Sequence, residues 1–497
     1  MAPVGVAVLA LATQGAPAWQ GALLGLISGL ACFLPLLSWS GVYVGALPWI
    51  ALAVLESLYL ALLGLVCALL QSRPWQARIG SVARIRPLVV ALAWVAQETL
   101  RGNTPFGGFP WGRLAFSQAD SPLAALASLG GAPAVTFAVA LAGGLLAAGV
   151  ARLIRAGRSL DLGSRERRLG VVPVLGVCCL VSAAVVILAP ALVPRPAAGP
   201  TGRFIAVQGN VPRPGLDFNA ERRAVLDNHA RATQQVAVSV RAGAQPRPDL
   251  VVWPENASDI DPTRNPDAAN VIEGAMEAIN APLVLGAVLR EPSPRESNAS
   301  LLYLPGRGLT WRYVKQHPVP FAEYIPYRSF FRNFSDKADL AGDFVAGKGA
   351  GVLRVPSRGG DTIAAGTVIC FEVAIDTLVR DTVDHGANVL LVQTNNATFG
   401  FTDESVQQLA ISRIRAVEHG RSIVHVSTVG VSAMITPDGT AHQRSALFTS
   451  DVLAADLPLR TDRTVADRVG PWPEIVAGGA LVASLALLAL SRLSRRR

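Results

Sequence analysis

The sequence predicts two structural parts: a bundle of membrane-spanning α-helices and a layered α/β domain inserted before the last span. The first observation is composition. Of the 497 residues, 51% are hydrophobic and only 16% are charged, whereas a soluble globular chain has about a quarter charged residues. The other two are a series of long apolar stretches and a change of pattern between residues 194 and 473, where short β-like runs alternate with polar helical segments.

Five apolar stretches are long enough to cross a bilayer, which takes about 20 helical residues. They cover residues 17–38, 41–71, 121–151, 170–193 and 474–491. Two weaker candidates, 3–14 and 86–100, are short or interrupted by polar residues. We therefore expect a transmembrane helical domain, a linker, a soluble domain, a second linker and a C-terminal transmembrane helix, at residues 1–193, 194–202, 203–460, 461–473 and 474–491.

Arginine-rich segments set the expected orientation. The loops at 73–86 and 152–168 and the tail 492–497 are basic, and basic loops stay in the cytoplasm. Alternation of the spans then places the soluble domain on the extracytoplasmic face of the membrane. It also places Met1 outside, from which we infer that a leading span is missing from this sequence. Because much of the net charge of +9 lies in these loops, we expect no nucleic-acid binding.

The soluble domain alternates strand-like and helix-like segments. Several apolar runs lack a strict polar–apolar alternation, which indicates strands covered on both faces and favours an α/β layered sandwich. The expected helices are 219–242, 266–279, 373–385 and 403–420. The expected strands are 203–208, 250–253, 282–289, 299–304, 362–369, 389–394, 423–427 and 433–436.

Three side chains in the soluble domain have the chemistry of a covalent catalyst. Cys370 ends one strand-like run and is the one cysteine outside the apolar segments, while Glu255 follows another run. Lys315 is one of three lysines in a chain that otherwise uses arginine, which suggests a need for a compact cation able to lose its proton. A carboxylate, an ammonium and a thiol can act as base, electrostatic stabiliser and nucleophile. The carboxyl ends of strands are also where α/β proteins place their chemistry.

Each of these residues also has a structural interpretation. Cys370 alone is more often a buried thiol, Glu255 can cap a helix, and Lys315 can be a surface cation. The combination at strand ends favours catalysis. The sequence has no Cys-x-x-Cys or His-Glu-x-x-His pattern, and its histidines lack ligand spacing, so we expect no metal and no cofactor.

An ordered series of motifs extends from the apolar half to the soluble domain: Leu100-Arg-Gly, Gly108-Phe-Pro-Trp111, Phe116-Ser-Gln118, Val207-Gln-Gly-Asn210, Trp253-Pro-Glu255, Lys315 with His317, Pro320-Phe-Ala-Glu323-Tyr-Ile-Pro326, Ile369-Cys-Phe-Glu372, Thr394-Asn-Asn396 and Phe399-Gly400. The series resembles the nitrilase (carbon–nitrogen hydrolase) superfamily. With the membrane segments, it resembles the apolipoprotein N-acyltransferase family over nearly the whole chain. The resemblance implies an αββα sandwich and a Glu–Lys–Cys triad formed by Glu255, Lys315 and Cys370.

The resemblance also implies the reaction, its partners and its place. Cys370 would take an acyl chain from a membrane phospholipid as a thioester and pass it to the N-terminal amine of a diacylglyceryl-cysteine on an apolipoprotein. Phe371 would supply an oxyanion donor, Glu323 and Glu372 would orient Lys315, and Trp111, Phe321 and Tyr324 would contact substrate. We expect a monomer in the bacterial plasma membrane, with the catalytic domain extracytoplasmic.

Some residues depart from the family pattern. Asn396 stands where the family usually has aspartate, Thr398 where it has tryptophan, and Phe371 where tyrosine is common. Better-known members have a tryptophan near position 217, where this chain has only Phe218. Two other functions stay open. A membrane-tethered amidase hydrolysing a C–N bond would share the triad, and a scaffold that kept the fold without activity is a weaker alternative.

Overall fold

The structure, a computed structural model, describes residues 1–71, 85–161, 171–211, 221–333 and 342–494. They form two compact units. The first is Met1–Ser38 with Ala46–Pro194 and Val465–Arg497, and the second is Trp39–Gly45 with Arg195–Thr464. Several positions lie outside the described residues: Phe218, Lys337 (one of the three lysines of the chain), and the basic segments within 72–84, 162–170 and 495–497.

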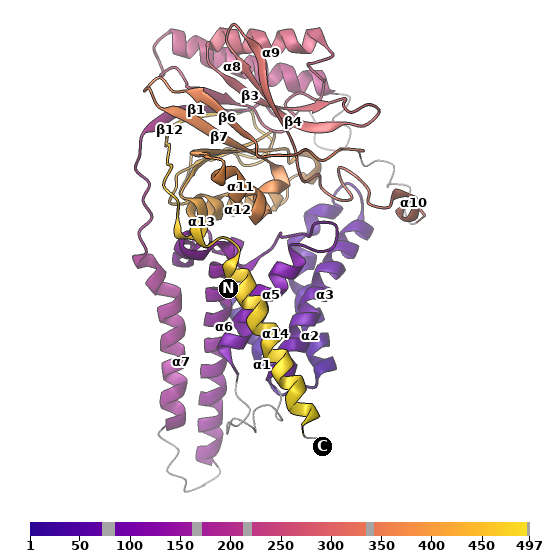
Figure 1. Cartoon of the computed structure of the whole chain (residues 1–497), viewed down its shortest axis with the longest axis vertical. Helices are drawn as coiled ribbons and strands as arrows, with labels where there is room; N and C mark the ends of the chain where they lie inside the picture. The colour runs from indigo at the N-terminus through magenta and orange to yellow at the C-terminus, as the bar shows by residue number, and fades with distance from the viewer. Residues whose placement is uncertain (72–84, 162–170, 212–220, 334–341, 495–497) are drawn as a thin grey trace. The chain divides into compact units, whose positions relative to one another are not determined.

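The first unit is helical (Figure 1). Five of its described helical stretches are long and apolar enough to cross a membrane, and α1 is a shorter apolar helix. The helices are α1 (Ala2–Ala12), α2 (Ala18–Leu36), α3 (Ala46–Leu70), α5 (Pro87–Arg101), α6 (Ala127–Asp161), α7 (Val171–Leu188), α13 (Val465–Val469) and α14 (Trp472–Leu493), with short 3-10 turns at η2 (Leu114–Gln118), η3 (Pro122–Leu126) and η4 (Ala189–Leu192).

Helices α2 and α3 pack closely because glycines line their contact. Gly21, Gly25 and Gly29 recur every fourth residue on one face of α2. A Cβ atom at Gly25 would lie 2.0 Å from the carbonyl oxygen of Leu60, so no other residue fits there without displacing a backbone. Small residues at this spacing let helix backbones approach in lipid, where van der Waals contact drives association.

A buried ion pair fixes the turn that follows α5. Arg101 Nη1 lies 2.7 Å from Glu56 Oε2 on α3, and both side chains are 1% exposed. The same nitrogen donates to the carbonyl oxygens of Phe109 at 2.9 Å and Trp111 at 2.6 Å. The Leu-Arg-Gly motif thereby holds the Phe-Pro-Trp motif.

The described part of the second unit contains two six-stranded sheets. The first has the order β12 (Asp451–Pro458), β1 (Thr201–Gln208), β2 (Leu250–Val252), β3 (Leu283–Leu289), β4 (Ser297–Leu304), β5 (Gly308–Val314). The second has the order β11 (Ala441–His442), β10 (Ala433–Ile435), β9 (Ser422–Ser427), β8 (Val389–Thr394), β7 (Thr362–Ile369), β6 (Val352–Pro356). In each sheet three central strands run parallel, β1–β2–β3 and β7–β8–β9.

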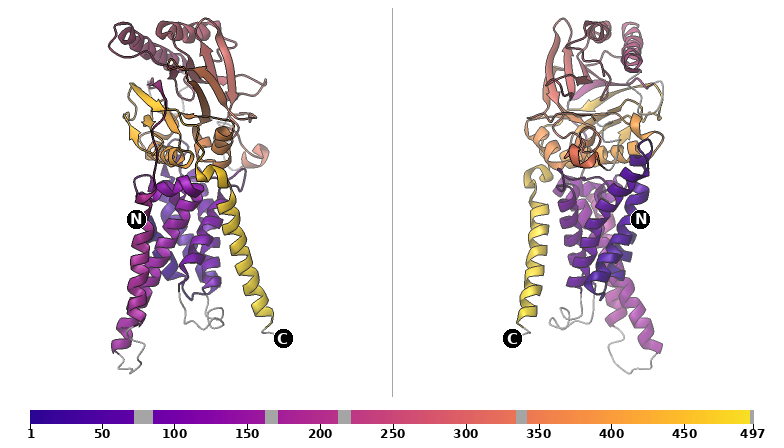
Figure 2. Two further views of the ribbon diagram at one scale, coloured as in Figure 1. Left: turned by 60° about the vertical axis from the view of Figure 1, so that its left-hand side comes forward. Right: turned by 90° about the vertical axis from the view of Figure 1, so that its right-hand side faces the viewer.

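The sheets stack between two helical layers, as Figures 1 and 2 show. Helices α8 (Arg222–Arg241) and α9 (Pro266–Ile279) cover the first sheet, while α11 (Asp376–Asp384) and α12 (Glu404–His419) cover the second. Along β1, Ile205 and Val207 pack toward α8 and α9, and Phe204 and Ala206 pack toward the second sheet. This is the αββα sandwich that the sequence resemblance implied.

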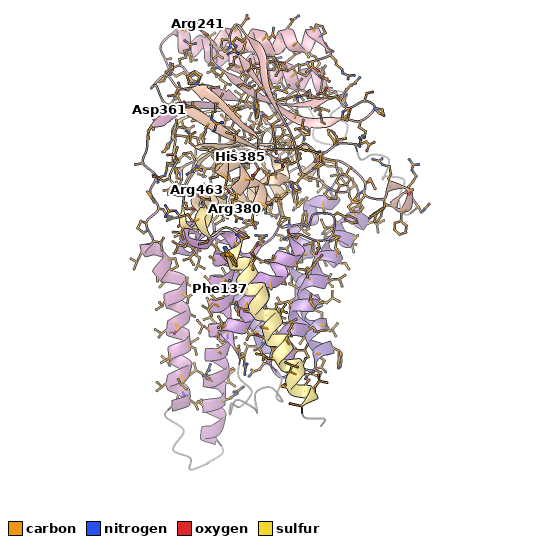
Figure 3. The ribbon with its side chains drawn as sticks, in the orientation of Figure 1. Phe137, Arg241, Asp361, Arg380, His385 and Arg463 are labelled. Carbon is orange, nitrogen blue, oxygen red and sulfur yellow. The ribbon has the colours of Figure 1, made fainter. Side chains whose placement is uncertain are left out.

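Charged side chains lie on the surface of the second unit, whereas several helices of the first unit are apolar. Figure 3 labels Arg241 at the end of α8 and His385 just after α11, and both are exposed. Arg463 forms an ion pair with Asp384. By contrast, Phe137, labelled in the same figure, lies in the hydrophobic helix α6.

The short segment 39–45 belongs to the second unit although α2 and α3 of the first unit flank it. The ring of Trp39 stands edge-on to Phe399, with 4.9 Å between centroids. Its indole N–H donates to Gln407 Oε1 at 3.2 Å. The α/β unit is therefore built from two separate stretches of chain.

The eight strands and four helices expected in the soluble domain are present in the structure, with ends shifted by a few residues. The segment 370–374, partly included in an expected helix, is the 3-10 turn η7 (Cys370–Ala374), and α11 begins after it. Four further strands were not predicted: β5, β6, β11 and β12. All four are the edges of their sheets, where exposed polar residues weaken the strand pattern.

Replacing Gly286 of β3 with alanine should destabilise the α/β unit. A Cβ atom there would lie 2.5 Å from the carbonyl oxygen of Pro254 and 2.6 Å from Glu255 Cα, and overpacking of this kind costs about 1–3 kcal/mol. We expect a lower melting temperature for Gly286→Ala in detergent. The matched control is Gly274→Ala in α9, where an added Cβ meets nothing within 4 Å. Equal melting temperatures for the two variants would contradict the packing argument.

Candidate active site

The three residues singled out by the sequence follow strands at the same end of the sandwich. Glu255 comes three residues after β2, Lys315 directly after β5, and Cys370 directly after β7. Strand β5 pairs antiparallel with β4, which pairs antiparallel with β3, so β5 runs in the direction of β2 and β3. Each residue therefore leaves the carboxyl end of its strand.

A buried glutamine joins the two sheets beside this end. Gln393 on β8 is fully buried; its Nε2 donates to the carbonyl oxygen of Trp253 at 2.6 Å, and its Oε1 accepts from Ser300 Oγ at 2.7 Å. Thr428 Oγ1, after β9, donates to the carbonyl oxygen of Glu255 at 2.9 Å. These bonds fix the backbone at Glu255 relative to the second sheet.

Lys315 is buried between two carboxylates. Its Nζ lies 3.1 Å from Glu255 Oε1 and 2.9 Å from Glu323 Oε2, and its side chain is 1% exposed. Burial disfavours the charged ammonium, but the charges of Glu255 and Glu323 outweigh it and raise the pKa of Lys315 well above its usual value. The expectation of a lysine able to lose its proton is therefore wrong: two neighbouring negative charges keep the amine ionised.

Asn298 connects the same two carboxylates. Its Nδ2 donates to Glu255 Oε1 at 2.6 Å and to Glu323 Oε1 at 3.0 Å, and its carbonyl oxygen accepts from the backbone N–H of Lys315 at 2.8 Å. Asn298 was not among the site residues predicted from the sequence. The available signal was an asparagine beside a predicted apolar strand, since a buried amide requires partners.

Glu255 is held by donors on both oxygens. Oε1 accepts from Asn298 and Lys315, while Oε2 accepts from the backbone N–H of Asn395 at 2.9 Å. Burial raises the pKa of Glu255; the Lys315 ammonium opposes this shift and the Glu323 charge adds to it. A carboxylate oxygen has two lone pairs, so Oε2 has capacity to accept a further proton.

Cys370 has a strained backbone at the turn from β7 into η7. Its φ of +53° is unusual for a residue with a side chain. The sulfur lies 3.4 Å from Thr394 Oγ1 and 3.5 Å from Gln408 Nε2. The turn thereby directs the thiol toward side chains from β8 and α12.

The electrostatics of the site keep the thiol protonated at rest. Burial raises the pKa of Cys370, the charge of Glu255 raises it further, and the Lys315 ammonium lowers it. A nucleophilic thiolate therefore has to form by transfer of the proton to a base during attack.

Glu372 organises the backbone on both sides of the site. Its carboxylate accepts from the backbone N–H of Gln316 at 2.6 Å, His317 at 3.2 Å and Ile369 at 2.8 Å. The hydroxyl of Tyr313 donates to both of its oxygens. Burial raises the pKa of Glu372 to about 7, although these backbone donors oppose the shift. Glu372 thus holds the residues that follow Lys315 and the one before Cys370, while Glu323 contacts Lys315 directly.

The other expected site residues have mixed surroundings. Phe371 is buried, and Phe321 is 47% exposed with its ring edge-on to Phe331 at 4.9 Å. The carbonyl oxygen of Tyr324 accepts from the backbone N–H of Phe321 at 2.7 Å. Trp111 lies in the helical unit, 3% exposed, with its ring stacked on Phe109. Substrate contacts by Trp111, Phe321 and Tyr324, and the oxyanion donor at Phe371, stay predictions.

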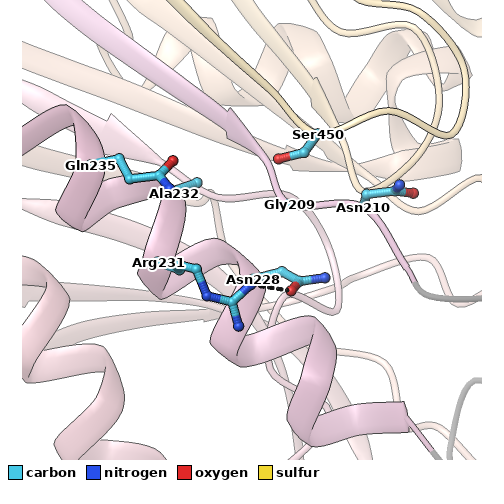
Figure 4. A pocket seen from close by; sticks show the side chains of 7 residues that line it. All are labelled: Gly209, Asn210, Asn228, Arg231, Ala232, Gln235 and Ser450. Atoms are coloured by element: carbon cyan, nitrogen blue, oxygen red, sulfur yellow. Dashed lines mark hydrogen bonds between the residues drawn. The ribbon is translucent and has the colours of Figure 1, made fainter.

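A separate hollow of about 190 Å³ lies at the end of β1 (Figure 4). Its one charged side chain, Arg231, donates to Asn228 Oδ1 at 3.2 Å. The lining contains no carboxylate, thiol or imidazole, and consists of Gly209, Asn210, Asn228, Arg231, Ala232, Gln235 and Ser450. This lining therefore offers no pair of carboxylate and thiol like the one near Lys315.

Comparison with known proteins covers both units. A family model described as "Apolipoprotein N-acyltransferase N-terminal domain" matches residues 1–145, and one described as "Carbon-nitrogen hydrolase" matches residues 206–467. An apolipoprotein N-acyltransferase of Mycolicibacterium smegmatis is 41% identical over 492 residues, 95% of this chain and 78% of the relative. The chain belongs to the apolipoprotein N-acyltransferase family.

More distant members of the apolipoprotein N-acyltransferase family align over similar lengths. The relative from Ralstonia nicotianae is 31% identical, covering 96% of this chain and 85% of its own. The relative from Geobacter metallireducens is 29% identical, covering 93% and 86%. Among solved structures, an amidase from Nesterenkonia sp. is 20% identical with a TM-score of 0.37, covering 53% of this chain and 93% of the amidase.

Lys315→Met should destabilise the protein in a pH-dependent way. Loss of one partner of a buried ion pair costs about 3–5 kcal/mol, and without the ammonium the pKa of Glu255 rises further. A carboxyl whose folded pKa exceeds its unfolded value of about 4.5 loses stability as pH rises between the two values. We therefore expect the melting-temperature deficit against the native protein to be larger at about pH 8 than at about pH 5.

The matched control is Lys348→Met, because Lys348 is exposed. It should leave the melting temperature unchanged at both pH values. A deficit of equal size at both pH values in Lys315→Met would contradict the electrostatic account.

Proposed function

We propose that this protein transfers an acyl chain from a membrane phospholipid to the N-terminal amine of the diacylglyceryl-cysteine of apolipoproteins, through a thioester on Cys370. The observation that carries this proposal is the 41% identity to an apolipoprotein N-acyltransferase over 95% of the chain. The match includes the helical unit, where residues 1–145 fit the N-terminal domain of the same family. An amidase activity is not favoured, because the match to apolipoprotein N-acyltransferases extends over both units.

The first half-reaction makes the acyl-enzyme. Glu255 accepts the thiol proton of Cys370 as the sulfur attacks the sn-1 ester carbonyl. The oxyanion that develops is stabilised by the ammonium of Lys315, an effect often worth about 3 kcal/mol per donor. The leaving alcohol takes the proton from Glu255, and the lysophospholipid departs.

The second half-reaction transfers the chain. The α-amine of the acceptor attacks the thioester carbonyl, the amide forms, and the sulfur leaves with a proton. Glu255 and Lys315 serve again as proton carrier and charge stabiliser. Because the resting thiol is protonated and buried beside carboxylates, it reacts when an ester is positioned against it rather than as a free thiolate.

The apolar helices support the proposed location in a membrane. Five described stretches suited to crossing a membrane support a multi-pass protein of the bacterial plasma membrane. The proposed orientation, from the basic segments of the sequence, puts the α/β unit on the extracytoplasmic face. We further propose that the protein acts as a monomer.

Cys370→Ala should abolish acyl-enzyme formation. Mass spectrometry after incubation of the native protein with phospholipid should find an added acyl mass on the peptide containing Cys370, and none in the variant. The control is Cys178→Ala, which removes an exposed cysteine of α7 and should leave the acylation of Cys370 intact. Acylation of the Cys370→Ala protein at another residue would refute the assignment of the nucleophile.

Glu255→Gln should block the first half-reaction, because the amide cannot take the thiol proton. General-base catalysis contributes about 10²–10⁴-fold, so single-turnover acylation of Cys370 should slow by at least about a hundredfold. The measurement is the rate of lysophospholipid release. Unchanged release would contradict the role of Glu255 as base.

A further inference from the structure

Two side chains outside the triad contact the sulfur of Cys370. Thr394 Oγ1 on β8 lies 3.4 Å away and Gln408 Nε2 on α12 lies 3.5 Å away. Both residues are fully buried. The effect of Gln408 on the sulfur depends on which end of its amide faces Cys370, because the nitrogen donates a hydrogen bond and the oxygen only accepts one. The hydrogen-bond partners of Gln408 determine this orientation.

The hydrogen bonds that orient the Gln408 amide start from Ser427, the last residue of β9. Its hydroxyl oxygen accepts from the backbone N–H of Gly430 at 2.8 Å, and it lies 2.5 Å from Asn396 Oδ1. A backbone N–H can only donate, so the hydroxyl proton of Ser427 is directed to Asn396. The Asn396 amide therefore presents its oxygen to Ser427 and its nitrogen to the opposite side.

The nitrogen of Asn396 then fixes Gln408. Asn396 Nδ2 donates to Glu404 Oε2 at 2.6 Å and to Gln408 Oε1 at 3.0 Å. Thr394 Oγ1 donates to the same oxygen of Gln408 at 2.7 Å. With two donors on its oxygen, Gln408 turns its –NH₂ group to the sulfur of Cys370.

We propose that Gln408 is a further catalytic residue, whose amide N–H donates a hydrogen bond to the Cys370 sulfur, and that Asn396 is the positioning residue which sets its orientation. Thr394 has one hydroxyl proton and directs it to the nearer oxygen of Gln408, which leaves the Gln408 amide as the donor to the sulfur. Once the proton has left, the N–H of Gln408 stabilises the negative sulfur. This role rests on the proposed function, which makes Cys370 the nucleophile.

The surroundings explain why such a donor is useful. Glu255 opposes a negative sulfur at Cys370, and so does Glu404 once it ionises; burial raises the pKa of Glu404 to about 8. Lys315 is the cation that offsets them, but it also serves two carboxylates. A neutral N–H from α12 adds stabilisation on the side of the sulfur that lies toward Glu404.

The test is the pH dependence of the alkylation of Cys370 by iodoacetamide, quantified on the Cys370 peptide by mass spectrometry. Gln408→Met removes the donor at similar size, and Gln408→Glu keeps the shape but replaces the N–H with an acceptor. A hydrogen bond to a charged group is worth about one pKa unit or more. We therefore expect the midpoint to rise by about one pH unit in Gln408→Met and further in Gln408→Glu.

The control is Gln407→Met, which changes the neighbouring glutamine that bonds Trp39 and should leave the midpoint in place. An unchanged midpoint in the folded Gln408→Glu protein, or an equal rise in Gln407→Met, would overturn the inference. If Gln408→Met does not fold, the isosteric Gln408→Glu decides alone.

The assay separates this inference from the proposed function, because alkylation needs no lipid. If the midpoint rises as expected in the Gln408 variants but the native protein forms no acyl-enzyme with phospholipid, the hydrogen bond is supported and the proposed acyl transfer is refuted. If the acyl-enzyme forms and the midpoint is unchanged in the Gln408 variants, the acyl transfer is supported and the role of Gln408 is refuted.

Discussion

The site depends on one buried positive charge. The ammonium of Lys315 lies between Glu255 and Glu323 with almost no contact with solvent, and without it the two neighbouring carboxylates would have no counter-charge, at a cost of several kcal/mol. Asn298 and the backbone N–H of Asn395 take up the remaining carboxylate oxygens. A compact ammonium fits between two carboxylates that a planar guanidinium would separate, which explains a lysine in a chain that otherwise uses arginine.

The charge balance also explains how the thiol is controlled. Burial and the carboxyl groups of Glu255 and Glu404 raise the pKa of Cys370, so the sulfur stays protonated at rest although Lys315 opposes this shift. A thiol in that state resists adventitious oxidation and alkylation, since the thiolate is the reactive form. The strained backbone at Cys370 and the bonds of Glu372 to Ile369 and Gln316 keep the sulfur in place meanwhile.

The sequence predicted the parts of the fold that are buried on both faces. The central strands read as apolar runs, and Glu255 and Cys370 stood out because each follows such a run. The four edge strands were missed because water on one side permits residues such as Thr310, Arg312 and Asp456 that break the pattern.

Asn298 and Gln408 were missed for a different reason. Each is a single polar residue in or beside a regular element, and only the packing of distant strands shows that its amide meets Glu255 or Cys370. The ionisation of Lys315 likewise depends on Glu323, whose contact with the lysine comes from a turn that periodicity does not reveal.

The two-stretch origin of the α/β unit has a practical consequence. Trp39 and its neighbours come from between α2 and α3, yet the indole covers Phe399 and bonds Gln407. Phe399 follows Asn395, whose backbone N–H donates to Glu255, and Gln407 precedes Gln408. A fragment of residues 195–464 would therefore lack the Trp39 ring that packs against Phe399. The loop after β8 would have fewer contacts in that fragment than in the intact chain.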